Sequence, residues 1–141
     1  MKTHDTLIPT RFMSTICFLV ATIMVFSTMA ENILMALPPN YSESSYRSNS
    51  TSFTFALVLT LISIGVNLLG FMLGFSMFMP AVCVLNIVSH TVGCIYTCVF
   101  IMQSWHFMTF WYIWVFFAGP VALLELSIIF GTLCLGSVNR V

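Results

Sequence analysis

The stretch FTFALVLTLISIGVNLLGFMLGF, residues 53–75, decides the fold class of this chain. It contains no charged residue, and a helix of this length crosses the roughly 30 Å hydrocarbon core of a bilayer. Three further apolar stretches are long enough to do the same, and they span residues 12–30, 82–102 and 111–135. Runs this long favour helices over membrane strands, whose apolar residues alternate. The sequence therefore predicts an all-α membrane protein, a bundle of four transmembrane helices.

The composition of the whole chain agrees with this prediction. Of its 141 residues, 60% are hydrophobic and 6% are charged, whereas a soluble domain carries about a quarter charged residues. Four Lys and Arg balance four Asp and Glu, so the sequence offers no basic surface for nucleic acid. We expect a single membrane domain over residues 1–141, with the lipid bilayer as its main partner and without an internal repeat.

The few basic residues predict the orientation of the bundle. Lys2, Arg11 and Arg140 would lie on one side of the membrane, and Arg47 would lie on the other. Basic residues are enriched on the cytosolic side of membrane proteins. Both termini are therefore expected in the cytosol, and the long connection over residues 31–52 is expected on the external or lumenal side.

Both N-glycosylation sequons of the chain lie in this connection. One is Asn40-Tyr41-Ser42 and the other is Asn49-Ser50-Thr51. Asn49 lies close to the expected start of the second span, so Asn40 is the stronger candidate for modification. The sequons and the basic residues therefore predict the same orientation, with the connection on the external or lumenal side.

The first span has an alternative interpretation as a cleaved signal peptide that ends at the small residues Thr28-Met29-Ala30. The apolar run over residues 12–30 is longer than the core of a signal peptide, which has about 7–15 residues, and Arg11 directly precedes it. We favour a retained helix. Cleavage would leave three spans in the same orientation.

The sequence contains no recognisable catalytic or cofactor motif. His90, Cys94 and Cys98 are spaced by four residues, as a metal-binding stripe could be, but zinc usually takes three or four ligands and cysteine often serves as a small residue in a lipid-embedded helix. All five cysteines fall within expected spans. The short motifs of hydrolases, zinc proteases and phosphate-binding loops are absent. We therefore expect no enzymatic activity, no metal and no cofactor.

The most informative residues are polar ones inside the spans. Asn67, His90 and Glu125 each lie about 12–15 Å from the cytosolic end of their helix, so they would share one layer near mid-membrane. An isolated charge there costs at least about 2.5 kcal/mol. Glu125 is therefore expected to be protonated or paired with His90, with Asn67 close enough to join. Pro120 is expected to kink the fourth helix.

This layer allows two interpretations. An intramembrane acid is a candidate for a proton or ion path, which would make the chain a small four-span transporter or channel subunit using Glu125 and His90. Alternatively, the layer is a polar clasp that fixes the register of the helices. We favour the clasp, because the sequence lacks the internal repeat and interrupted helices of many carriers.

Small residues predict where the helices approach one another, because pairs of small residues four apart let helix backbones come close. One set belongs to the second and third spans, which would face each other, and another set belongs to the fourth span and would contact a further helix. These residues are Gly70, Gly74, Ser89, Gly93, Ser127 and Gly131.

Short motifs along the chain occur in the same order as in a known family. They are Leu7-Ile8-Pro9-Thr10-Arg11-Phe12, Asn32-Ile33, Leu37-Pro38, Tyr46, Gly70-Phe71, Gly74, Ser76-Met77-Phe78, His90, Trp111-Tyr112-Ile113, Val115-Phe116, Pro120 and Glu125. On these motifs the chain resembles the transmembrane protein 107 family over nearly its whole length. It departs from the family at Asn67, where a glutamate is usual.

The resemblance implies a function that composition does not give. The family belongs to the membrane-embedded part of the Meckel-syndrome module at the ciliary transition zone. The resemblance implies a non-enzymatic scaffold that recruits or retains module proteins, among them tectonics and B9-domain proteins, and supports cilium assembly and the gating of ciliary membrane composition. It also implies that both termini are cytosolic, in agreement with the basic residues.

Overall fold

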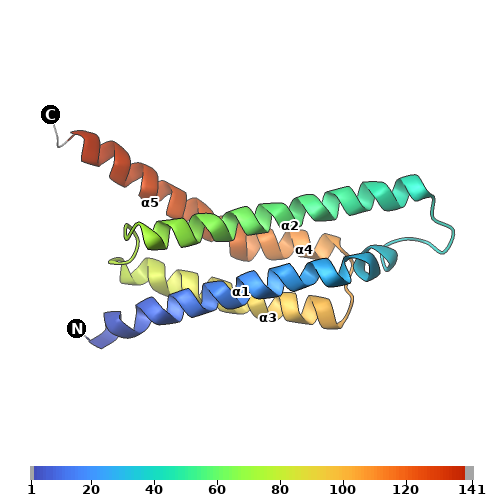
Figure 1. The fold of residues 1–141 in the computed structure, drawn as a ribbon, viewed down its shortest axis with the longest axis horizontal. Coiled ribbons are helices and arrows are strands. Elements are labelled where there is room, and N and C mark those ends of the chain that lie inside the picture. The colour runs from blue at the N-terminus through green and yellow to red at the C-terminus, as the bar shows by residue number, and fades with distance from the viewer. Residues whose placement is uncertain (1, 139–141) are drawn as a thin grey trace.

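The computed structural model describes residues 2–138, with side chains from residue 5 to residue 135, and this part of the chain is almost entirely helical (Figure 1). Within it, four helical segments are long and apolar enough to cross a membrane, which confirms the predicted four-helix membrane bundle. The fourth segment contains a short π-helical stretch, η1. The elements are α1 (Lys2–Leu34), α2 (Glu43–Met72), α3 (Pro80–Met102), α4 (Met108–Ile113), η1 (Trp114–Ala118) and α5 (Gly119–Val138).

The connection expected over residues 31–52 is shorter in the structure, because both flanking helices extend beyond their apolar runs. α1 continues to Leu34 and α2 begins at Glu43, so only residues 35–42 connect them. The Oγ atom of Ser42 accepts a hydrogen bond from the backbone N–H of Ser45 at 3.3 Å, which caps α2. The polar composition of residues 43–52 predicts a loop. In the structure these residues are helical, and their backbone N–H and C=O groups bond within α2 or to the Ser42 cap.

Glycine and proline shape the remaining connections. Gly74 has a φ of +76° and follows the end of α2, and Pro80 is the first residue of α3. In the fourth segment Pro120 is the second residue of α5, which follows η1, and α5 departs from the direction of α4 (Figure 1). The irregular π-helical stretch over Trp114–Ala118 therefore lies just before Pro120, where the kink is expected.

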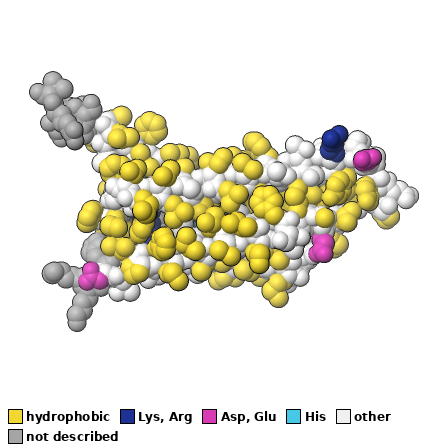
Figure 2. All heavy atoms as spheres, viewed as in Figure 1, with side chains coloured by type: hydrophobic (Ala, Val, Ile, Leu, Met, Phe, Trp, Pro, Cys, Tyr) yellow, Lys and Arg dark blue, Asp and Glu magenta, His cyan; other side chains and the backbone are white. Residues whose placement is uncertain are grey.

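The helices pack so that the start of α1 and the end of α5 lie at one end of the bundle, with the connection over residues 35–42 at the other (Figure 1). α1 packs against α3 and α2, and α2 packs against α5. On the face shown in Figure 2, apolar side chains cover the middle and charged side chains lie at the two ends. Of the basic residues that predicted orientation, Arg140 and the side chain of Lys2 lie outside the described residues.

The end of the bundle near residues 35–42 has an aromatic core. Phe53 of α2 is fully buried, and its ring centroid lies between 5.7 and 6.2 Å from those of Phe100, Phe107 and Phe110. Asn32 of α1 is also buried there, and its Nδ2 atom donates a hydrogen bond to the backbone carbonyl of residue 105 at 2.7 Å. The opposite end is held together by polar groups.

Candidate functional site: a buried ion pair

An ion pair between Arg11 and Glu125 joins α1 to α5 inside the bundle. Nη2 of Arg11 donates to Oε1 of Glu125, and the two residues are only 1% and 0% exposed. The pairing corrects the sequence-based expectation, in which Glu125 was protonated or paired with His90. Arg11 was expected to flank the first span, but α1 begins well before it and carries it into the interior.

The Arg11 guanidinium is held by groups from several segments. Its Nη1 atom donates to Oγ of Ser76 at 2.9 Å, in the turn between α2 and α3, and lies 3.7 Å from Sγ of Cys83 in α3. Its central carbon stands 5.5 Å from the centroid of the Phe71 ring, which adds a cation–π contact from the end of α2. A single side chain thus connects α1, α2, α3 and α5.

The Glu125 carboxylate is fitted closely between α2 and α3. Its Oε1 atom also accepts a hydrogen bond from Nδ2 of Asn86 at 3.3 Å. Gly70 of α2 provides the space for the other oxygen, because a Cβ atom at position 70 would collide with Oε2. An arginine and an amide therefore compensate a charge that would otherwise be expensive inside a bilayer.

His90 is bonded to α1 rather than to Glu125. Its Nδ1 atom lies 2.9 Å from Oγ1 of Thr15, and that hydroxyl donates its hydrogen to the Arg11 carbonyl at 2.9 Å. Because a hydroxyl has one hydrogen to give, Nδ1 of His90 must be the donor in the contact with Thr15. The centroid of the His90 ring also lies 5.5 Å from the centroid of the Phe18 ring. His90 therefore ties α3 to α1 one turn away from the ion pair.

Asn67 is buried in the same bundle but does not bond to Glu125 as expected. Its Nδ2 atom donates to the backbone carbonyl of Ser63 at 2.9 Å, within α2. The Ser63 hydroxyl in turn accepts a hydrogen bond from Nε1 of Trp114 at 3.1 Å. Ser63 of α2 therefore contacts the π-helical stretch, while the Glu125 carboxylate is bonded by α1 and α3.

Comparison with known proteins places this arrangement in a family. A family model for TMEM107, described as a transmembrane protein, matches residues 7–129. This chain belongs to the transmembrane protein 107 family. It is 31% identical over 129 residues to transmembrane protein 107 of Danio rerio, a match that covers 92% of this chain and 96% of the relative. It is 32% and 31% identical over 122 residues to the proteins of Rattus norvegicus and Homo sapiens, covering 86% of this chain and 87% of each. No solved structure matches significantly.

The segment that matches the transmembrane protein 107 family includes both members of the ion pair and two close helix approaches. Gly70 is one of them, as described above. Gly93 of α3 is the other, because a Cβ atom there would lie 3.1 Å from Cβ of Phe117 and 3.2 Å from the Phe18 ring. Both glycines lie at close helix approaches, but in the described bundle the second and third spans do not pack against each other as expected. Gly70 faces Glu125 of α5, and Gly93 faces Phe117 of η1 and Phe18 of α1.

The other small residues singled out in the sequence have different surroundings. A Cβ atom at Gly74 or at Gly131 would meet nothing within 4 Å, and Gly74 instead adopts the positive φ that follows the end of α2. Ser89 is half-buried. Ser127 is exposed, and its Oγ atom donates to the Leu123 carbonyl within α5. The expected contact of Ser127 and Gly131 with another helix therefore does not occur within the described bundle.

The cysteines of the described residues are all free. Among the described side chains, no group of three or more His, Cys, Asp and Glu could hold a metal ion. The stripe of His90, Cys94 and Cys98 therefore does not form a metal site in this part of the chain, and His90 already bonds to Thr15.

The sequence did contain a signal for the missed partner of Glu125. A buried acid in one membrane helix calls for a cation in another, and Arg11 directly precedes the apolar run of the first span. Basic residues at that position usually extend towards the membrane surface, so the sequence predicts only an orienting role for Arg11. Ser76 and Cys83, which also contact Arg11, gave no comparable signal.

Proposed function

We propose that this chain is a non-enzymatic membrane scaffold of the ciliary transition zone, which supports cilium assembly and the gating of ciliary membrane composition. Membership of the transmembrane protein 107 family carries the proposal, through the role that the sequence resemblance implied. The names of the relatives identify a transmembrane protein and no enzymatic activity. Scaffolding requires a bundle of fixed shape, and the Arg11–Glu125 clasp supplies one by joining the first helix to the last.

The proposed orientation places both termini in the cytosol. The start of α1 and the end of α5 share one end of the bundle, in agreement with an even number of crossings (Figure 1). With both ends in the cytosol, the short segments there would be available to B9-domain proteins, while membrane partners such as tectonics would contact the helices.

The clasp also favours retention of the first helix. Cleavage after Ala30 would remove Arg11 and leave the Glu125 carboxylate buried between α2 and α3 without its cation. Removing one member of a buried ion pair is strongly destabilising. The proposed scaffold therefore keeps residues 1–30.

The outer part of α5 is the proposed contact for a partner helix in the membrane. α5 leaves the other helices there (Figure 1), Ser127 is exposed, and Gly131 has open space around it. Gly131→Leu should therefore reduce recovery of transition-zone partners in pull-down experiments. Gly65→Leu is the matched control, because Gly65 of α2 is equally open. Equal recovery with both variants would exclude this surface.

The location is tested by microscopy of the chain tagged at its C-terminus and expressed near native level in a ciliated cell. A band at the ciliary base, distal to the basal body, is expected. A diffuse plasma-membrane or endomembrane signal in cells with an intact transition zone would contradict the proposal. That outcome would favour the alternative function, a transporter or channel subunit using Glu125 and His90. Oε2 of Glu125 and Nε2 of His90 are buried without a hydrogen-bond partner among the described residues.

A further inference from the structure

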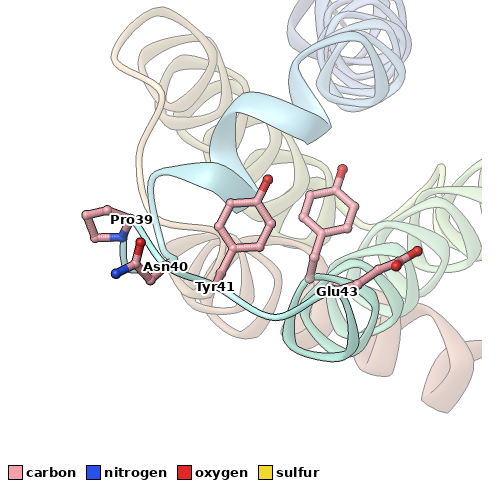
Figure 3. A pocket seen from close by; sticks show the side chains of 5 residues that line it. Pro39, Asn40, Tyr41 and Glu43 are labelled. Carbon is pink, nitrogen blue, oxygen red and sulfur yellow. The ribbon is translucent and has the colours of Figure 1, made fainter.

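A hollow of about 600 Å³ lies where the chain passes from residues 35–42 into α2 (Figure 3). Its lining consists of Pro39, Asn40, Tyr41, Glu43 and Tyr46. The hollow contains the first asparagine of a glycosylation sequon beside two aromatic rings. An acceptor site and a binding surface therefore occur together.

The helical extension of α2 places Asn40 well above the membrane. Glu43 lies ten positions before Phe53, where the apolar run begins, and at 1.5 Å per residue this offset raises the start of α2 by about 15 Å. The headgroup layer on each side of a bilayer is about 5–8 Å thick. Asn40 lies beyond that helix start, in the irregular connection, and its side chain is exposed. It has the accessibility that an N-linked acceptor needs.

The second sequon neither stands clear of the membrane nor lies in an irregular connection. Asn49 lies inside α2, about 6 Å along the helix from Phe53, so it stands at the depth of the lipid headgroups. The hydroxyl of Thr51, the third residue of that sequon, donates to the Arg47 carbonyl at 2.9 Å within the helix. The structure therefore adds helical backbone and headgroup depth to the reasons for preferring Asn40 over Asn49.

Two tyrosines form an apolar surface beside Asn40. The ring centroids of Tyr41 and Tyr46 lie 6.2 Å apart with 34° between the ring planes, and both rings line the hollow (Figure 3). Glu43 also lines the hollow. A pyranose sugar offers a face of C–H groups surrounded by hydroxyls, which suits an aromatic surface with a polar rim.

We propose that Asn40 carries an N-linked glycan whose first sugar packs on the Tyr41–Tyr46 surface. This inference rests on the proposed orientation, because the modification requires that residues 35–42 face the lumen of the secretory pathway. In the transfer, Nδ2 of Asn40 forms a bond to C1 of the sugar of a lipid-pyrophosphate-linked oligosaccharide. The bond from C1 to the pyrophosphate breaks, the lipid pyrophosphate leaves, and the amide loses one proton.

The acceptor is tested by electrophoresis of the full chain from eukaryotic cells before and after treatment with a peptide N-glycosidase. The treated wild type and Asn49→Gln should both shift to higher mobility, and untreated Asn40→Gln should already run at the deglycosylated position. Ser42→Ala is a poorer test than Asn40→Gln, because Ser42 also caps α2. A wild type that does not shift, or a shift lost in Asn49→Gln instead, would overturn the proposal.

Protease protection of a C-terminal tag in sealed microsomes separates this inference from the orientation. A tag digested from outside, together with an unmodified Asn40, would overturn the glycan while the orientation stands. A protected tag would overturn the orientation and the glycan with it. A digested tag and a modified Asn40 would support both.

The aromatic surface is tested by the rate at which the same glycosidase removes the glycan under native conditions in mild detergent. Tyr46 lies outside the sequon, so Tyr46→Ala should leave modification intact and speed release several-fold. Tyr112→Ala is the control, because Tyr112 is 65% exposed and lies outside the hollow. Equal release rates for all three proteins would show that the sugar does not pack on the tyrosines.

Discussion

The two ends of the bundle are held together by different physical means. At the end near residues 35–42, Phe53 packs among aromatic rings whose contacts depend on shape. At the other end, Arg11 and Glu125 hold four segments through charge and hydrogen bonds. A packed ring that is truncated leaves a void, whereas a buried ion that loses its partner leaves an uncompensated charge. The polar end should therefore be the more sensitive to single substitutions and the easier to rescue by a second one.

Arg11→Met should have the largest effect. It leaves Glu125 buried and unpaired, which costs about 3–5 kcal/mol of unfolding free energy. The measurement is reversible unfolding of the purified chain in mixed micelles with increasing denaturing detergent.

The double variant Arg11→Met/Glu125→Met is the control for this effect. Replacing a buried pair by apolar groups of similar size is often neutral or stabilising, so the double variant should recover most of the lost stability. If the double variant is as unstable as Arg11→Met, packing around Arg11 rather than charge compensation explains the loss.

Phe53→Ala should have a smaller effect, below about 3 kcal/mol. In water the loss of a buried phenylalanine costs about 3–5 kcal/mol, but part of that is transfer from water, and packing between helices in a membrane largely lacks this term. The same unfolding titration measures it. A loss larger than that of Arg11→Met would reverse the proposed ranking of the two ends.

The comparison also explains what the sequence could predict. Apolar runs such as residues 53–75 reveal spans because bilayer thickness sets their length, and the family motifs extend that prediction to the fold. The partner of Glu125 depends on how α5 emerges from η1 and on how far α1 extends before Arg11, and neither follows from local composition. The helical start of α2 was missed for a similar reason, because residues 43–52 are polar and their helix is set by the Ser42 cap.

Gly70→Ala should destabilise the polar end by about 1–3 kcal/mol, because the added methyl group would displace the Glu125 carboxylate. Gly131→Ala is the matched control in the same titration. It adds a methyl group where nothing lies within 4 Å, so its effect should stay within about 0.5 kcal/mol. Similar losses in both variants would indicate that Gly70 acts through the backbone rather than through contact with Glu125.

Thr15→Val should give the smallest effect, because the only bond between helices that it removes is the hydrogen bond from α1 to the His90 ring. Such bonds between membrane helices contribute about 0.6 kcal/mol on average and up to about 1.7 kcal/mol. Thr22→Val is a close control: Thr22 is also buried in α1, and its hydroxyl donates to the Phe18 carbonyl as that of Thr15 does to the Arg11 carbonyl. The loss of the bond within the helix is common to both variants, so the difference between them reports what Thr15 contributes beyond it.

A double-mutant cycle with His90→Leu assigns that difference to the pair. If the bond between the Thr15 hydroxyl and Nδ1 of His90 accounts for it, Thr15→Val should cost no more than Thr22→Val once His90 is replaced. If Thr15→Val remains the costlier substitution in the His90→Leu background, the excess comes from disturbance of Arg11, which lies one turn away on the same helix. The ion pair between Arg11 and Glu125 would then depend on residues of α1 that it does not contact directly.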